Sequence, residues 1–466
     1  MDNDNLDMFS RLTSSLLVLI VSYLPFKEAA RTSVLSKQWR NVWRETTYLE
    51  FDEKSFVNLE ETDENQRIQR SFFFDFIRQF LANYPRTPIQ KFSLTCSKPE
   101  GFLADIQNFV IFAISRNVKD LELDFSDPIW REEDDPKNHP AAVELPFQVY
   151  QHLGLESLKL ISCNFDLSRF SNSTTLKGVS LVWVDMSLAS IEILLLRFPF
   201  LESLSLKKCW NIHHVEITVP NLRLKNLVLD KCHFNRNYYY IDGPTLRFLK
   251  FSGRVGIFQL VNLTQIEEAD LDFGMEPEFD DIGILLYYFL EAVCAAKVLT
   301  LCSVLLQEIV PTSHEPVRLR APLAVRHLIL KTAMHPNEFY GVRFMFRNCP
   351  KLEILTFEIC PAKIFPDYEP PFELNPSEFW SEEIWVQMCM KKSLKVINVK
   401  GFKGTPNELY ILRYIIMCAR KLRKVNFYVF DGDDLEEIWE KFCYLRQVPS
   451  SSKNLKTHIQ LISMDT

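Results

Sequence analysis

The chain has 466 residues, of which 47% are apolar and 24% charged, and its formal net charge is −7 at pH 7. This chain is longer than one ordinary globular domain, so we expect several domains or one elongated repeat array. The acidic balance lacks the basic stripe of general nucleic-acid and anionic-membrane binders, and it disfavours both classes of partner.

Eleven cysteines are present without any CxxC pair, and no secretory leader pattern fits the N-terminus. We interpret them as reduced thiols, which predicts a nuclear or cytoplasmic location. The longest apolar segment, residues 282–301, is interrupted by Glu291 and Lys297. We therefore expect no membrane span.

Residues 11–43 are predicted to form three short helices. Thr13 or Ser14 can cap the first, Pro25 separates it from the second, and Ser36 can cap the third. Their apolar side chains exceed what so small a module can bury, so the excess should pack on the next domain or dock on another protein. The candidate docking residues are Leu12, Leu16, Leu17, Ile20, Leu24, Pro25, Val34, Leu35, Trp39 and Trp43.

Residues 22–40, with the sequence SYLPFKEAARTSVLSKQWR, and the following Trp43 resemble the F-box of plant F-box proteins with leucine-rich repeats. The resemblance implies that the candidate docking residues bind a Skp-type adaptor and, through it, a cullin scaffold. The family usually opens with Leu-Pro and an acidic residue, whereas this chain has Leu12, Thr13 and Ser14.

An acidic stretch, residues 44–64, follows and is predicted to be a solvated linker. Residues 65–84 then have the spacing of an amphipathic helix. The face predicted to be buried consists of Ile68, Phe72, Phe73, Phe76, Ile77 and Phe80.

From residue 89 onward, the pattern apolar–any–apolar recurs thirteen times, at irregular steps mostly in the twenties. Four copies have the fuller form L-x-x-L/F-x-L/F-x-x-C and begin at Leu155, Leu201, Leu224 and Leu352. This self-similarity indicates a leucine-rich-repeat solenoid, in which stacked neighbours bury leucines that one repeat cannot cover. The pairs stand at 92/94, 121/123, 158/160, 179/181, 204/206, 227/229, 249/251, 269/271, 299/301, 328/330, 355/357, 397/399 and 425/427.

Residues 393–425 resemble the FBD region that follows the repeats in many plant F-box proteins. The resemblance implies a strand-turn-helix-strand unit that closes the array, and residues 457–462 are expected to add a last strand. The predicted fold is α/β, with a three-helix F-box at 1–50 and an acidic linker with an amphipathic helix at 51–88. Leucine-rich repeats occupy 89–375, and an FBD-like cap occupies 376–466.

No enzyme signature is found: the P-loop, GxSxG and HExxH patterns are all absent. Cys209, His213, His214, Cys232 and His233 gather in one segment, but their spacing fits no standard zinc site. We therefore expect a non-catalytic chain without a metal or other cofactor.

Side chains between and beside each buried pair should point to the concave face of a solenoid, because side chains alternate along a strand. Repeat proteins bind targets on such faces. The candidate target-binding residues are Lys159, Lys207, Lys250, Asp270, Asp272, Thr300 and Lys331.

The resemblance implies a substrate receptor of an SCF-type ubiquitin ligase, which holds an unidentified target protein near the ubiquitin-loading partner. Two alternatives stay open. One is a scaffold with a weakened F-box, motivated by the departure at residues 12–14. The other is a repeat protein that senses a small molecule on its concave face.

Overall fold

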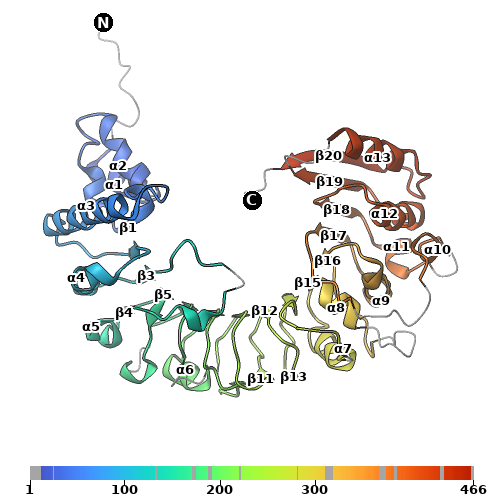
Figure 1. Ribbon diagram of the computed structural model, residues 1–466, viewed down its shortest axis with the longest axis horizontal. Coiled ribbons are helices and arrows are strands. Elements are labelled where there is room, and N and C mark those ends of the chain that lie inside the picture. Colours follow the sequence, from blue (N-terminus) through green and yellow to red (C-terminus); the bar gives the residue numbers. More distant parts are fainter. Residues whose placement is uncertain are drawn as a thin grey trace, which may run out of the picture. The chain divides into compact units, whose positions relative to one another are not determined.

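The computed structural model describes residues 12–24, 26–131, 134–170, 175–186, 191–219, 222–280, 282–309, 319–366, 374–381, 386–430 and 435–462 (Figure 1). The chain forms two compact units. Unit 1 consists of residues 1–213 and 219–223, and unit 2 of residues 214–218 and 224–466.

Unit 1 contains parallel strands in the order β1-β2-β3-β5-β7-β8. Consecutive strands pair residue for residue, so that Leu49, Phe92, Leu121 and Leu158 stand side by side. A short pair, β4 (Val143–Glu144) and β6 (Cys163–Asn164), lies beside this sheet. The sheet strands are β1 (Tyr48–Asp52), β2 (Lys91–Thr95), β3 (Asp120–Asp124), β5 (Ser157–Ile161), β7 (Gly178–Val182) and β8 (Ser203–Lys207).

Unit 2 continues the same pattern, again with every described pairing parallel. Its strands are β10 (Asn226–Asp230), β12 (Phe248–Ser252), β14 (Glu268–Asp272), β15 (Val298–Cys302), β16 (His327–Thr332), β17 (Ile354–Ile359), β18 (Val396–Lys400), β19 (Lys424–Phe430) and β20 (Lys456–Ile462). The last of these confirms the strand expected at residues 457–462.

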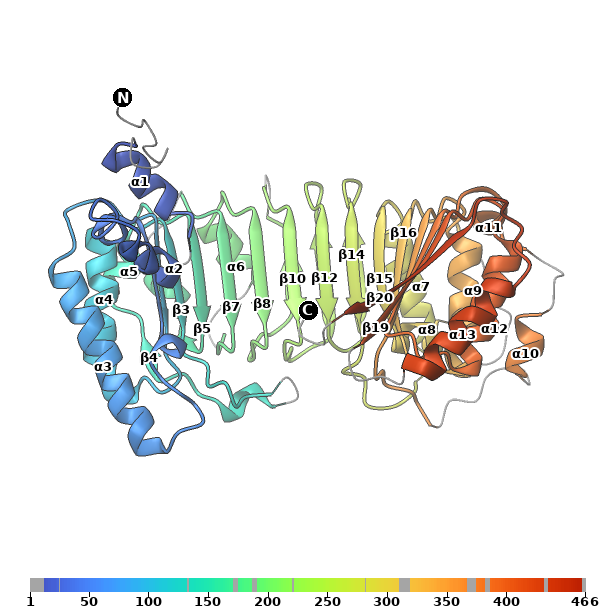
Figure 2. The same ribbon diagram turned by 90° about the horizontal axis from the view of Figure 1, so that it is seen from above.

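The thirteen predicted apolar pairs form the core of both units. Every one of their side chains is at most 2% exposed. The strands of each sheet lie side by side (Figure 2). Buried residues alternate along each repeat strand with less buried ones, and we call the side of the less buried residues the open face. The repeat prediction is therefore confirmed along its whole length.

The return segments are helical in most repeats. In unit 1 they are α3 (Asp63–Ala82), α4 (Leu103–Ser115), α5 (Phe147–Gln151) and α6 (Ile191–Arg197). In unit 2 they are α7 (Gly283–Ala292), α8 (Ser303–Glu308), α9 (Phe339–Asn348), α10 (Pro376–Phe379), α11 (Met388–Lys392), α12 (Pro406–Cys418) and α13 (Leu435–Gln447).

Extended returns replace helices near the start of unit 2, which the sequence did not predict. Strands β9 (Val215–Ile217), β11 (Tyr238–Asp242) and β13 (Ile257–Val261) form a separate parallel sheet in the order β13-β11-β9. Phe258 of β13 packs edge-on against Phe289 of α7, with ring centroids 4.5 Å apart.

The prediction of a solvated linker at 44–64 is wrong for its middle part. Residues 48–52 form β1, the first strand of the sheet, and bury Leu49 and Phe51. Glu53 follows and is also buried, where Arg70 of α3 donates to its carboxylate at 2.9 Å. An acidic composition concealed this strand because its outward-facing residues are the acidic ones.

Helix α3 is confirmed, but its buried face is rotated from the predicted one. Ile68 and Phe72 are exposed, whereas Phe74 is fully buried. Phe74 stacks on Phe102 at a centroid distance of 4.1 Å. The segment that contains Phe102 covers this side of α3. The spacing of apolar residues within α3 alone could not predict that contact.

The strand-turn-helix-strand order predicted for residues 393–425 is present as β18, α12 and β19. The predicted closing role is not seen in the described residues, because β20 continues the sheet beyond β19 and itself forms an edge. Leu461 of β20 is 51% exposed. The sheet therefore extends by one strand beyond β19, and among the described residues no further strand pairs with β20.

The ion pair between Glu53 and Arg70 should contribute strongly to the stability of unit 1. Burial by itself raises the pKa of Glu53, but hydrogen bonds from Arg70 and Ser97 outweigh burial, and the net pKa is lowered. Arg70→Met leaves a buried unpaired carboxylate and should cost about 3–5 kcal/mol in urea unfolding. Adding Glu53→Gln should recover part of that loss.

The half-exposed Arg78, paired with Asp75 at 2.5 Å, provides the control. Arg78→Met should cost less than about 1 kcal/mol. Because the folded pKa of Glu53 is lowered, the contribution of the pair is complete above the ordinary glutamate pKa and disappears as the pH falls through the folded value. Equal losses for Arg70→Met and Arg78→Met would contradict this assignment.

Candidate docking surfaces

The N-terminal module, residues 12–45, begins with α1 (Ser14–Val21) and α2 (Phe26–Arg31). The predicted third helix is wrong: residues 37–41 form turns, followed by a 3₁₀ helix at Val42–Glu45. Thr13 is at the N-cap of α1, but its side chain makes no cap hydrogen bond. Pro25, one of the candidate docking residues, lies outside the described residues.

A small core holds this module together. It consists of Leu17, Val21, Ala29, Trp39 and Val42. Leu17 is 0% exposed and Trp39 is 7% exposed, so these two candidates support the module from inside. Three others are partly buried against the same core: Leu12, Ile20 and Trp43.

The module is also packed directly on the first repeat. Phe26 of α2 contacts Phe51 of β1 and Phe80 of α3, at centroid distances of 5.2 and 5.4 Å. Trp43 stacks on Phe80 at 5.5 Å, and Tyr84 donates to the carbonyl of Thr46 at 2.9 Å. One side of the module is therefore a helical cap on the next domain, as one sequence-based alternative proposed.

Large apolar side chains nevertheless remain exposed elsewhere on the module. Val34 is 85% and Leu35 is 64% exposed, and both were candidates. Leu19 and Tyr23 were missed, although they follow Leu16 at helical spacing. We call the following set the docking residues: Leu16, Leu19, Tyr23, Leu24, Val34 and Leu35.

On the open face, the candidate target-binding lysines are already engaged in ion pairs. Lys159 contacts Glu122 at 2.5 Å, and Lys250 contacts Asp230 at 2.9 Å. Lys331 reaches across β15 to Asp270 at 3.4 Å. A target would have to exchange these partners to bind them.

The three remaining candidates on this face differ in their access to solvent. Thr300 is only 5% exposed and offers little surface to a target. Asp272 accepts from the Ser252 hydroxyl at 3.1 Å and from the amide of Gly274 at 2.9 Å. Lys207 is half-buried.

A ladder of neutral polar groups on β16–β19 was missed by the sequence analysis. His327 Nε2 lies 2.9 Å from the Thr356 hydroxyl, to which the Asn398 amide also donates at 3.2 Å. Asn426 in turn donates to Asn398 at 2.9 Å. Burial, with Lys400 nearby, lowers the pKa of His327, so its imidazole is neutral at pH 7. The alternating pattern of each strand places these residues on the open face. Only the strand register brings them next to one another.

The repeat cysteines have a structural role. Cys209 Sγ lies 3.4 Å from the carbonyl of Leu181, and Cys163 Sγ lies 3.6 Å from that of Ile161. Burial raises the pKa of the Cys163 thiol, so it is inert at neutral pH. His214 Nε2 lies 3.1 Å from the carboxylate of Glu216. Within the described part of the chain, no three metal-ligating side chains gather.

None of the helices that the structure describes is long and apolar enough to cross a membrane.

Comparison with known proteins gives two family matches. The F-box domain model matches residues 9–48, and the At1g61320/AtMIF1 LRR domain model matches residues 81–438. F-box protein At3g62230 of Arabidopsis thaliana is 34% identical over 434 residues, which cover 92% of this chain and 93% of that protein.

The chain belongs to the family of F-box proteins with leucine-rich repeats. A more distant member, F-box/FBD/LRR-repeat protein At4g26340 of Arabidopsis thaliana, is 26% identical over 460 residues, or 97% of this chain and 99% of that protein. The resemblance of residues 393–425 to an FBD region stays a prediction. The N-terminal module is the F-box, and the docking residues lie on it.

Leu16 and Leu17 are adjacent in the F-box and should respond differently to truncation. Leu17→Ala removes a fully buried side chain and should cost about 2–5 kcal/mol of stability. Leu16→Ala removes a side chain that is 46% exposed and should cost less than about 1 kcal/mol. Urea unfolding of both variants measures the difference. A loss at Leu16 as large as at Leu17 would place Leu16 in the core and remove it from the docking residues.

Proposed function

We propose that this chain is the substrate-recognition subunit of an SCF-type cullin-RING ubiquitin ligase. In this role the F-box binds a Skp-type adaptor, and the repeats hold a target protein for ubiquitination. The family is typically non-catalytic. Its contribution is proximity, because holding the target raises the local concentration of its lysines beside the ubiquitin-loading partner.

The observation that carries the proposal is the exposure of the docking residues on a module that already has a complete core. Scattered exposed leucines are ordinary, but six large apolar side chains within twenty residues mark an interaction surface. Phe26, by contrast, is already covered by Phe51 and Phe80. The docking residues are therefore the apolar surface left for a partner.

For the repeats, the open face supports a protein target. Its ion pairs and its neutral ladder present alternating donors and acceptors, which suit a polar protein surface. A nuclear or cytoplasmic location follows from the proposed partners, since cullin ligases work there. Nucleic acid and membrane are not proposed as partners.

A scaffold without ligase coupling is the second candidate, and residues 12–14 favour it. The family's usual proline is replaced by Thr13, whose side chain makes no cap bond. Adaptor binding distinguishes the two candidates. A small-molecule sensor on the open face remains a third hypothesis that a thermal-shift screen would test.

A negative charge placed among the docking residues should weaken adaptor binding strongly. Val34→Asp and Leu35→Asp should each weaken co-purification with a plant Skp-type adaptor at least tenfold, because a desolvated carboxylate in an apolar interface has no partner. Thermal unfolding of both variants should stay within a few degrees of the wild type, since both sites are exposed.

Leu196→Asp, at an equally exposed leucine on α6, is the matched control and should bind normally. If the unmodified chain fails to bind the adaptor at micromolar concentration, the ligase proposal is wrong. If Leu196→Asp weakens binding as much as Val34→Asp, the docking residues are misassigned.

Restoring the family's proline should strengthen adaptor binding. Thr13 has φ −70°, which matches the fixed φ of proline, so Thr13→Pro fits the backbone at the N-cap of α1. We expect affinity to rise a few-fold through a better-ordered first turn, measured by biolayer interferometry. Thr13→Ala is the control and should leave affinity unchanged. An unchanged affinity for Thr13→Pro would show that this departure does not limit binding.

A further inference from the structure

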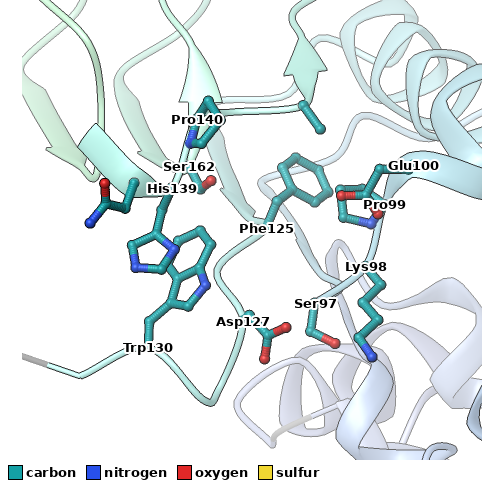
Figure 3. Close-up of a pocket in the computed structure, with 12 residues that line it drawn as sticks. Ser97, Lys98, Pro99, Glu100, Phe125, Asp127, Trp130, His139, Pro140 and Ser162 are labelled. Atoms are coloured by element: carbon teal, nitrogen blue, oxygen red, sulfur yellow. The ribbon is translucent and has the colours of Figure 1, made fainter. Parts of the chain in front are cut away.

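A hollow of about 420 Å³ lies in unit 1, where the chain leaves strands β2, β3 and β5 (Figure 3). One wall is the turn after β2, which carries Glu100. The other is the long loop after β3, which carries Asp127, Trp130 and His139, and Phe125 lies between them. Its volume is within the range of about 300–1,000 Å³ that is typical of small-molecule pockets.

The aromatic side chains of this wall pack against residues of later repeats. Trp130 and His139 pack with centroids 4.4 Å apart, and each also contacts Trp183 just beyond β7, at 5.3 and 5.5 Å. Lys208, after β8, lies over the ring of Trp183 at 5.2 Å and donates to the carbonyl of Asp134 at 3.2 Å. Described residues of this loop therefore contact residues that follow β7 and β8.

The polar groups of the hollow are unevenly satisfied. Ser162 is only 3% exposed, and its hydroxyl makes no hydrogen bond to any described residue. Asp127 accepts from the amide of Ile129 at 3.1 Å, but within the described chain neither its carboxylate nor that of Glu100 has a cationic partner.

Two positive charges beside the hollow already have acidic partners. Lys98, the cation of the lining, pairs with Asp63 at 3.2 Å. The hydroxyl of Ser97 accepts from Arg70, whose charge is matched by Glu53. The hollow therefore combines an aromatic wall, the hydroxyl of the nearly buried Ser162 and two carboxylates without a described cationic partner.

We propose that this hollow binds an arginine side chain on a segment of the target protein. The planar guanidinium would lie against Trp130, since guanidinium groups stack on aromatic faces. Its five N–H donors would supply the bonds that Asp127, Glu100 and Ser162 lack. Its apolar stem would pass along Phe125 and Pro140, which also line the hollow.

This inference rests on the proposed function only in naming the bound segment as part of a target. The binding itself is a property of unit 1 and needs no adaptor. Failure of adaptor binding would leave the hollow unaffected, and an empty hollow would leave adaptor docking unaffected. The two proposals therefore fail separately.

The test is a titration of the full chain with the peptide acetyl-Gly-Gly-Arg-Gly-Gly-amide up to about 10 mM, followed by tryptophan fluorescence. The matched peptide carries citrulline, which has the shape of arginine without its charge. We expect the arginine peptide to bind at least fivefold more tightly. The double variant Glu100→Gln/Asp127→Asn should lose that preference.

Glu60→Gln/Glu144→Gln removes the same charge from exposed positions outside the hollow and should keep the preference. Trp130→Phe should remove most of the fluorescence change and identifies its source. Equal binding of the two peptides, no response to either, or a preference that survives in Glu100→Gln/Asp127→Asn would each overturn the proposal. Matching thermal unfolding of the variants shows that they are folded.

Discussion

Each strand that carries one of the thirteen apolar pairs buries two side chains that it cannot cover by itself, and the rest of the structure depends on that constraint. In unit 1, Leu121 and Leu123 of β3 are covered by the pairs of β2 and β5 and by the helices behind them. The need to cover each apolar pair is met by the two adjacent repeats and does not involve more distant ones. Returns can therefore change from helix to strand, and loops can lengthen, as long as each pair stays in register.

The F-box meets this constraint at its first strand. Phe51 belongs to β1 and contacts both Phe26 of the F-box and Phe92 of β2. The aromatic cluster thus joins the docking module to the repeat core without an intervening flexible linker. This contact matters for the proposed proximity mechanism, because it fixes the proposed docking residues relative to the first repeats of unit 1.

Charge is used differently on the two candidate binding regions. On the open face, Lys159, Lys250 and Lys331 neutralise carboxylates of neighbouring strands. A target binding there exchanges one set of partners for another, which favours specificity over affinity. In the hollow of unit 1, by contrast, Asp127 and Glu100 have carboxylates still available for a cation.

The repeat strands, the amphipathic helix and the F-box could be identified from the sequence because each is encoded locally. A period of two defines a strand and a period of 3.6 defines a helix, so all thirteen buried pairs were predicted. Strand β1 was the exception. Its short apolar pair, Leu49 and Phe51, lies within an acidic stretch, and composition outweighed the alternation.

What only the tertiary structure decided is which apolar and charged side chains remain available. Leu16 and Leu17 are identical in type and adjacent, yet one is exposed and the other is core, because the packing partners of α1 lie elsewhere in the chain. In the same way, the alternation of apolar residues identifies Lys159 as an outward-facing residue. Its pairing with Glu122, however, depends on the register between β3 and β5. Local periodicity determines the face of an element, whereas exposure and pairing depend on what distant segments place against it.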